Sequence, residues 1–265
     1  MPTAKIIPAV PIVAEWPKRR MHHVFAADGR AVIVAMDHGI KGVVPGLIDV
    51  KSAVRAVVAG GADAVMTTVG MGRAVSAVLG RVGWILALDS ERSVATYGID
   101  EALREGADAV ELKVFPGSIG DEKLGELREL AAQASAVGLP LMAEAIPVSF
   151  TDTDAHTVEN IASGARICAE AGADFVKVPF AETVERYREV IDATFVPVLV
   201  LGGSLHSDPS GALQLAADAM ASGAYGVVFG RNVFQAGDPE RMVAALCEIV
   251  HGGMPVARAR QIIGS

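Results

Sequence analysis

The chain has 265 residues, of which 51% are hydrophobic, and its formal net charge is −8. This length and apolar content allow one large buried core, while an acidic chain without a basic run argues against a nucleic-acid partner. No apolar run reaches the ~18 residues that a membrane-spanning helix needs and no signal-like stretch opens the chain, so we expect a cytoplasmic protein without a membrane partner.

A short repeat organises the chain. Gly-Ala-Asp followed by apolar residues begins at Gly61, Gly106 and Gly172, and a related form, Gly-Ala-Tyr, begins at Gly223. Each copy follows a helix-like stretch, where glycine adopts positive φ without strain. The apolar run that follows each triplet is typical of a strand buried on both faces. The repeat therefore predicts α/β units.

Eight apolar runs separated by helical patterns are predicted to be strands. They cover about residues 31–37, 63–68, 83–88, 108–114, 140–146, 174–178, 197–201 and 225–229. Helices are predicted at 50–60, 121–137, 156–171, 182–192, 211–222 and 239–251, whereas the crossovers after the second and third strands give weaker helical signals. The alternation favours a parallel sheet.

Eight such units in one chain of this length favour a single-domain (β/α)8 TIM barrel over an open doubly wound sheet. An open sheet usually carries a glycine fingerprint after its first strand, and here Asp37-His38-Gly39 follows instead. We assign residues 1–265 to one barrel domain. Residues 1–30 precede the first strand and are expected to be an N-terminal extension that caps the barrel or contacts another subunit.

Neither the cysteines nor the acidic residues show metal-ligand spacing. Cys168 and Cys247 lie in helix-like segments without a CxxC partner, so we interpret both as structural thiols. No His, Asp or Glu cluster has ligand spacing either, and we expect no metal site.

Charged residues collect where the active site of such a barrel lies, at the carboxyl ends of the strands. Asp37 and His38 follow the first strand, Lys113 and Glu144 lie in the fourth and fifth, and Lys177 ends the sixth. Buried charges are costly unless they are paired or used. These residues are therefore candidates for catalysis, with His38 more suited to contacting a ligand.

Lys177 is the candidate nucleophile. Its apolar surroundings disfavour the charged form, which predicts a lowered pKa and the ability to form a Schiff base with a carbonyl group. A second ammonium, that of Lys113, is expected to lower this pKa further, while Asp37 or Glu144 moves protons. The alternative is a lysine that extends its amine into solvent from the strand end.

The other two ionisable candidates also have purely structural interpretations. Lys113 shares a strand face with Glu111 and can pair with it or with Asp89, which follows the third strand. Glu144 can form an ion pair with a neighbouring lysine. Both alternatives remain open at the level of the sequence.

Two glycine-rich turns predict a phosphate site. Gly202-Gly203-Ser204 follows the seventh strand, and Gly230-Arg231 follows the eighth. Glycine lets backbone N–H groups approach phosphate oxygens, and a helix N-terminus adds a favourable dipole. The alternative is a pair of ordinary turns, but their positions after the last two strands favour phosphate binding.

Taken together, these motifs resemble the class I (Schiff-base) aldolases grouped with deoxyribose-phosphate and archaeal-type fructose-bisphosphate aldolases. The resemblance covers nearly the whole chain from Gly29. The matching motifs are Ala35–Gly39, Phe115–Ser118, Gly172–Lys177, Gly202–Ser204 and Gly230–Gln235.

The resemblance implies a TIM barrel with Lys177 as the Schiff-base lysine and Asp37 beside the carbinolamine. It further implies a phosphate held by the backbone at Gly202–Ser204 and Gly230–Arg231. The expected protein is a cofactor-free homo-oligomer that acts on a phosphorylated sugar or a related carbonyl compound.

One position departs from the fructose-bisphosphate branch, which has a Tyr-Pro pair at the end of the fifth strand where this chain has Ile146-Pro147. Isoleucine transfers no proton, so we assign that role to Glu144, with Lys113 as the second candidate. The departure keeps open the transfer reactions of the same family, represented by the aminodideoxyheptulosonate synthase and the autoinducer-2 thiolase. It also keeps open other substrates, such as tagatose bisphosphate and sulfofructose phosphate, and a non-catalytic sugar-phosphate-binding barrel.

Overall fold

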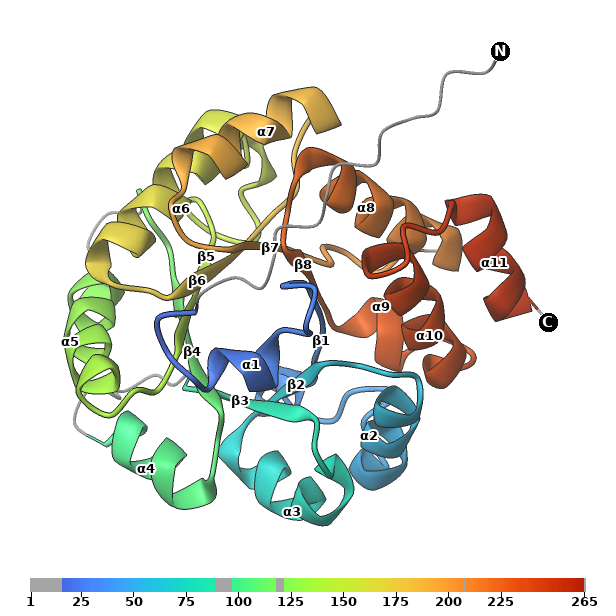
Figure 1. Ribbon diagram of the computed structural model, residues 1–265, viewed down its shortest axis with the longest axis horizontal. Coiled ribbons are helices and arrows are strands. Elements are labelled where there is room, and N and C mark those ends of the chain that lie inside the picture. The colour runs from blue at the N-terminus through green and yellow to red at the C-terminus, as the bar shows by residue number, and fades with distance from the viewer. Residues whose placement is uncertain (1–15, 89–96, 118–121, 207, 265) are drawn as a thin grey trace.

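Eight parallel strands pair in chain order, and β8 pairs with β1 to close the barrel (Figure 1). The computed structural model describes residues 16–88, 97–117, 122–206 and 208–264. The strands are β1 (Ala31–Ala35), β2 (Ala64–Thr67), β3 (Gly83–Ala87), β4 (Ala109–Val114), β5 (Leu141–Ala145), β6 (Phe175–Val178), β7 (Val198–Leu201) and β8 (Gly226–Phe229). Each lies within two residues of its predicted ends, and the predicted (β/α)8 barrel is confirmed.

Helices surround the barrel, and all six predicted helices are present. The outer ring contains α2 (Val50–Ala59), α3 (Val69–Leu79), α4 (Gly98–Glu105), α5 (Glu122–Ala136), α6 (Val158–Ala171), α7 (Val184–Ala193), α8 (Pro209–Ser222) and α10 (Pro239–Val250). Shorter or terminal helices are α1 (Met21–Val24), α9 (Arg231–Phe234) and α11 (Val256–Gly264), with 3₁₀ turns η1 (Asp37–Lys41) and η2 (Thr153–Ala155). The crossovers with weak signals thus contain α3 and α4. No helix in the described ranges is long and apolar enough to cross a membrane.

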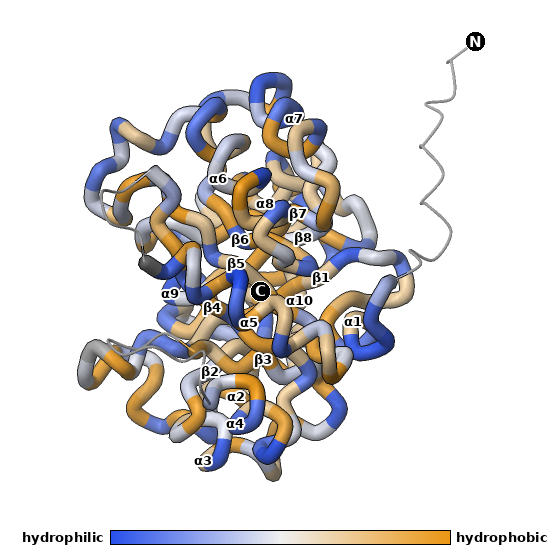
Figure 2. Tube along the Cα trace, turned by 90° about the vertical axis from the view of Figure 1, so that its left-hand side faces the viewer, coloured by the Kyte–Doolittle hydropathy of each residue, from blue (hydrophilic) through white to orange (hydrophobic). Residues whose placement is uncertain are grey.

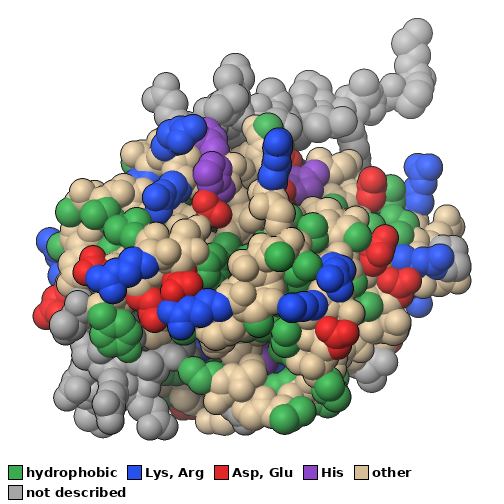
Figure 3. All heavy atoms as spheres, turned by 90° about the horizontal axis from the view of Figure 1, so that it is seen from below, with side chains coloured by type: hydrophobic (Ala, Val, Ile, Leu, Met, Phe, Trp, Pro, Cys, Tyr) green, Lys and Arg blue, Asp and Glu red, His purple; other side chains and the backbone are tan. Residues whose placement is uncertain are grey.

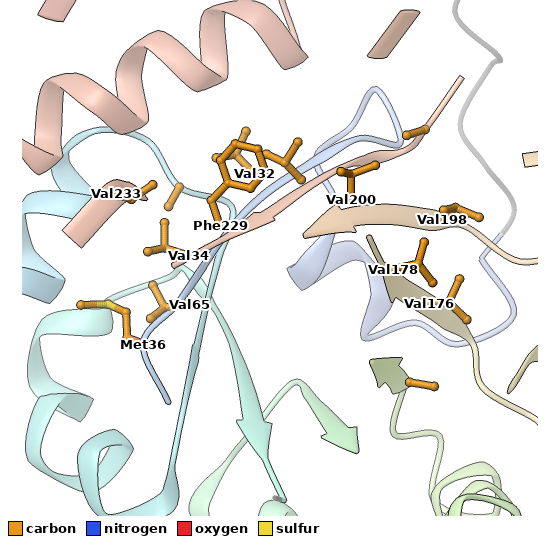
Figure 4. Close-up of a cluster of buried hydrophobic side chains, with 14 of the residues drawn as sticks. Val32, Val34, Met36, Val65, Val176, Val178, Val198, Val200, Phe229 and Val233 are labelled. Atoms are coloured by element: carbon orange, nitrogen blue, oxygen red, sulfur yellow. The ribbon is translucent and has the colours of Figure 1, made fainter. Parts of the chain in front are cut away.

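The core has two layers, because alternate residues of each strand face opposite sides. Val32 and Val34 of β1 and Val198 and Val200 of β7 are buried among the side chains that pack on the helices (Figure 4). A second cluster fills the barrel interior with residues such as Ile33. The strands are accordingly hydrophobic along most of their length (Figure 2), while acidic and basic side chains are interspersed over the surface seen in Figure 3.

The Gly-Ala-Asp repeat links neighbouring strands at the amino end of the barrel. Its glycines, including the fourth copy, have φ between 81° and 106°, as a turn after a helix requires. The aspartate two residues later accepts a hydrogen bond from the backbone N–H of the preceding strand. These bonds run from Val32 to Asp63 at 2.7 Å, from Trp84 to Asp108 at 3.0 Å and from Leu141 to Asp174 at 2.8 Å.

Each of these aspartates also meets a basic side chain. His251 Nε2 lies 3.1 Å from Asp63, His23 Nδ1 lies 2.6 Å from Asp108, and Lys18 Nζ lies 2.7 Å from Asp174. The other ring nitrogen of His251 contacts Asp28 at 2.9 Å. A basic side chain therefore lies within hydrogen-bond distance of each aspartate where these strands begin.

The segment before β1 packs into the amino end of the barrel. Met21 and Phe25 are buried with the interior cluster, and the Phe25 ring lies edge-on to Phe175 at 5.4 Å. Trp16 stacks at a tilt on Phe25, with 4.7 Å between ring centroids. The other part of the expected N-terminal extension, residues 1–15, lies outside the described residues.

Both cysteines are free thiols, with Cys168 buried in α6. Cys247 on α10 donates to the carbonyl oxygen of Gly61 at 3.2 Å, and burial raises the pKa of its thiol to about 12. A thiol with so high a pKa is unreactive near neutral pH, which agrees with the structural interpretation.

Candidate active site

A cavity of about 490 Å³ opens at the carboxyl ends of the strands. Its walls come from strands β1 and β4 to β8 and from the loops that follow them. All ten predicted site residues line it, namely Asp37, His38, Lys113, Glu144, Lys177, Gly202, Gly203, Ser204, Gly230 and Arg231. Residues far apart in sequence thus share one chamber.

Three ionisable side chains lie side by side on adjacent strands. Lys113, Glu144 and Lys177 are direct partners in the register of β4, β5 and β6. Glu144 lies between the two lysines, 2.8 Å from Lys177 Nζ and 3.6 Å from Lys113 Nζ. All three are at most 8% exposed. The interpretation of Lys177 as a solvated strand-end lysine is therefore wrong, because its amine is buried against a carboxylate.

This pairing corrects the expected pKa of Lys177. Burial alone lowers that pKa, as expected, but attraction to Glu144 and Asp37 outweighs burial and raises it. Burial likewise raises the pKa of Glu144, but Lys177 and Lys113 lower it below the ordinary value. Both partners are therefore ionised in this arrangement.

Glu111 lies on the same face of β4 as Lys113, deeper in the barrel. It is 0% exposed, and neither carboxyl oxygen has a hydrogen-bond partner. Glu111 therefore does not hold Lys113 by a hydrogen-bonded ion pair, and Glu144 lies beside Lys113 instead. The other suggested partner, Asp89, lies outside the described residues, as does Ser118 of the motif after β4.

Asp37 and His38 begin the 3₁₀ turn η1 directly after β1. The Asp37 Oδ1 atom lies 3.6 Å from His38 Nδ1, and the imidazole packs edge-on to Phe234 at 5.2 Å. A side chain at position 230 would clash here, since a Cβ on Gly230 would lie 2.6 Å from His38 Cε1. Glycine at this position thus allows the turn after β8 to approach η1.

Asn232 joins the two glycine-rich turns, and sequence reasoning missed it. Its side-chain amide donates to the carbonyl oxygens of Gly202 at 2.9 Å and Ser204 at 3.0 Å. Its side-chain oxygen accepts from the His206 N–H at 2.9 Å. Arg231 also reaches the Gly203 carbonyl oxygen at 3.5 Å, and Asn232 itself is 5% exposed. The turns after β7 and β8 therefore form one unit.

The loop after β5 supplies a wall that no motif indicated. Phe150, Thr153 and His156 line the cavity, and the Phe150 ring lies 5.7 Å from Lys113 Nζ. Val148 has φ of 59°, which is strained for a β-branched residue and turns the loop sharply. Ile146, where the fructose-bisphosphate branch has tyrosine, also lines the cavity. Among the described residues, no group of three potential metal ligands is present.

A sequence model described as DeoC/LacD family aldolase matches residues 31–236. The 2-amino-3,7-dideoxy-D-threo-hept-6-ulosonate synthase of Halobacterium salinarum is 36% identical over 239 residues, covering 85% of this chain and 88% of the relative. A synthase of the same name from Archaeoglobus fulgidus is 35% identical over 262 residues, covering 94% and 96%.

Solved structures of aldolases are also similar to this chain. An archaeal fructose-1,6-bisphosphate aldolase whose catalytic lysine is covalently bound to the carbinolamine intermediate superposes with a TM-score of 0.77 at 28% identity, covering 88% of this chain and 98% of that one. The family match spans most of the chain and includes every strand. The chain belongs to the DeoC/LacD family of aldolases, and it is a class I aldolase, a carbon–carbon lyase.

Proposed function

We propose that this aldolase cleaves or forms a carbon–carbon bond in a phosphorylated ketose or a related carbonyl compound through a Schiff base on Lys177. The observation that carries the proposal is the buried contact of 2.8 Å between Lys177 Nζ and Glu144, in a cavity that also contains two glycine-rich turns. A lysine that is buried, hydrogen-bonded to a carboxylate and open to a cavity is suited to covalent catalysis.

The first steps use the ion pair directly. Lys177 passes a proton to Glu144 across their hydrogen bond, and the neutral amine attacks the substrate carbonyl carbon. The carbinolamine then forms, and Glu144 returns the proton to its hydroxyl group, which leaves as water. The product is an iminium on Lys177, which takes the place of the ammonium beside Glu144.

Cleavage follows from the same pair. Glu144 accepts the proton of the substrate hydroxyl, the carbon–carbon bond breaks, and its electron pair enters the iminium to give an enamine. The aldehyde leaves, Glu144 protonates the enamine carbon, and water hydrolyses the new iminium. Lys113, 3.6 Å from Glu144, is the second candidate for these proton transfers, and Asp37 orients the carbinolamine.

The turns after β7 and β8 are suited to a phosphate group. The backbone at Gly203 and Gly230 has no side chain to cover it, and Arg231 adds a positive charge at the same end of the cavity. Asn232 fixes the two turns relative to each other through three hydrogen bonds. A phosphate bound here would share one cavity with Lys177.

A transfer reaction is the second candidate. Both heptulosonate synthase relatives are at least 35% identical, against 28% for the archaeal fructose-bisphosphate aldolase, and Ile146 replaces the tyrosine of that branch. In a transfer, the enamine on Lys177 attacks a second carbonyl compound instead of taking a proton. Product analysis with and without added acceptor aldehydes separates the two reactions.

We also propose, from the resemblance, that the protein is a homo-oligomer. From its sequence we propose that it is cytoplasmic and that residues 1–30 cap the barrel or contact another subunit. The packing of Met21 and Phe25 in the amino end of the barrel supports the capping role. Light scattering coupled to size-exclusion chromatography, with and without residues 1–15, tests the assembly.

The central test is chemical trapping. A panel of phosphorylated ketoses is assayed for release of triose phosphate, and borohydride is added during turnover, followed by peptide mass spectrometry. We expect a reduced adduct on Lys177 and none on Lys113, and we expect Lys177→Met to abolish both adduct and activity. An adduct elsewhere, or an active Lys177→Met variant, contradicts the proposal.

A further inference from the structure

The proposed mechanism leaves one buried acid without a role. Glu111 is fully buried in the barrel interior, and neither of its carboxyl oxygens has a hydrogen-bond partner. An ionised carboxylate in such a place is strongly destabilised, so the group keeps its proton. Burial raises the pKa of Glu111 well above the ordinary range. Even the neutral acid costs stability when its hydrogen-bonding groups stay unpaired.

The charges around Glu111 are balanced without it. The groups that act on it are Lys113 on β4, Glu144 on β5, Lys177 on β6 and Asp37 after β1, which carry two positive and two negative charges. The interior side chains of the remaining strands in the described ranges are apolar, and they include Ala64, Met66, Ile85, Ala87, Leu199 and Val228. Among the described residues, the two lysines and two acids that act on a neutral Glu111 are equal in number.

Glu144 is the neighbouring side chain to which a neutral Glu111 can donate a hydrogen bond. Glu111 is paired with Met142 in the register of β4 and β5, so Glu144 is the next interior residue along β5. Burial raises the pKa of Glu144, while Lys177, Lys113 and hydrogen bonding with Lys177 and Glu111 lower it. The register thus places Glu111 and Glu144 as diagonal neighbours on the barrel interior, and the two carboxyl oxygens of Glu111 have no other hydrogen-bond partner.

We propose that Glu111 is a proton-bearing positioning residue, whose neutral carboxylic acid donates a hydrogen bond to the Glu144 carboxylate and keeps Glu144 in its proton-accepting form. No bond breaks in this role, and the proton stays on Glu111 throughout the cycle. The inference rests on the proposed function, because it assumes that Glu144 transfers protons beside Lys177. It also accounts for an acid in the barrel core, where an apolar residue is the more stable choice.

Two variants at position 111 test whether the side chain acts as a hydrogen-bond donor or only fills the barrel core. Glu111→Gln keeps the size and two N–H donors but cannot ionise, whereas Glu111→Met keeps the volume and removes all hydrogen bonding. Met142→Leu is the matched control, since it alters the neighbouring interior position without touching the cavity. The pH profile of kcat/KM, the thermal midpoint of unfolding and borohydride trapping are measured for each.

We expect Glu111→Met to move the acidic limb of kcat/KM upward by about one to two pH units, the size of one hydrogen bond to a charged group. In Glu111→Gln and Met142→Leu, the acidic limb of kcat/KM should lie at the same pH as in the original protein. An unmoved limb in Glu111→Met, or equal shifts in Met and Gln, overturns the proposal.

A measurement without substrate tests the protonation state of Glu111 independently of the proposed function. The infrared difference spectrum between the original protein and Glu111→Gln near pH 7 should contain the carbonyl band of a protonated carboxylic acid. Only carboxylate bands in that difference overturn the neutral state of Glu111. By contrast, absence of a Lys177 adduct in the original protein, with the acid band present, refutes the proposed function alone.

Discussion

Replacing Glu144 with glutamine should separate proton transfer from Schiff-base formation. The carboxylate is 3% exposed and lies 2.8 Å from Lys177 Nζ, so the substitution leaves a buried ammonium without its counter-charge. Breaking a buried pair in this way costs about 3–5 kcal/mol when the remaining charge persists. Lys177 can escape by losing its proton, but holding an ordinary lysine neutral at pH 7 costs about 4–5 kcal/mol. Both routes predict a loss of about 4 kcal/mol in unfolding free energy.

The chemical consequence has two parts. Without Glu144 the largest influence that raises the pKa of Lys177 is gone, so the amine becomes neutral at lower pH. Borohydride trapping should therefore persist in Glu144→Gln, with its pH midpoint displaced downward. Turnover should fall by about 10²–10⁴, the usual contribution of a positioned acid or base.

The assays are urea unfolding near pH 7, steady-state kinetics and trapping across pH. Glu159→Gln is the matched control, because Glu159 pairs with Arg186 on the exposed surface and such pairs contribute little. A decrease in kcat of less than tenfold in Glu144→Gln refutes its assignment as the proton carrier. A trapping midpoint that moves upward refutes the electrostatic reasoning.

Three further substitutions test the surrounding structure. Asn232→Ala removes three hydrogen bonds between the turns, so KM for a phosphorylated substrate should rise about tenfold with kcat nearly kept, consistent with losing about 1–3 kcal/mol. Gly230→Ala should displace His38 and reduce kcat/KM, whereas Gly237→Ala, where a Cβ meets no atom within 4 Å, should not. Burial lowers the pKa of His251, but hydrogen bonds to Asp63 and Asp28 raise it overall. Its stabilisation is therefore complete below about pH 6.5 and lost as pH rises through the folded-state pKa. His251→Gln should cost more unfolding free energy in urea at about pH 6 than at about pH 9, and an equal cost at both contradicts this sign.

The barrel could be predicted because buried parallel strands leave apolar runs in the sequence, and several of the preceding helices end at glycine. The same pattern made Lys177 and Glu144 conspicuous, since charges inside apolar strands are rare. The sign of the Lys177 pKa could not be predicted, because it depends on Glu144 being its direct partner across two strands. Strand register is set by three-dimensional pairing and leaves no local signal in the sequence.

Other site residues could not be predicted from the sequence for similar reasons. An asparagine in a glycine-rich turn looks ordinary, and the role of Asn232 depends on carbonyl groups of a loop far away in sequence. Phe150 and His156 lie in the loop after β5, which has neither periodicity nor a motif. Glu111 was read only as a partner for Lys113, and its isolation becomes visible once the interior of the barrel is known.

The Gly-Ala-Asp repeat occurs once for every two strands, and this spacing makes the barrel an assembly of strand pairs. Aspartates join β1 to β2, β3 to β4 and β5 to β6, whereas the fourth copy has Tyr225 at the aspartate position. A quarter of the barrel is thus the natural unit for duplication or recombination. Lys113 belongs to the second pair, while Glu144 and Lys177 belong to the third. A chimaera that exchanges the second pair would therefore keep the proposed nucleophile with its carboxylate and replace the second lysine together with Glu111.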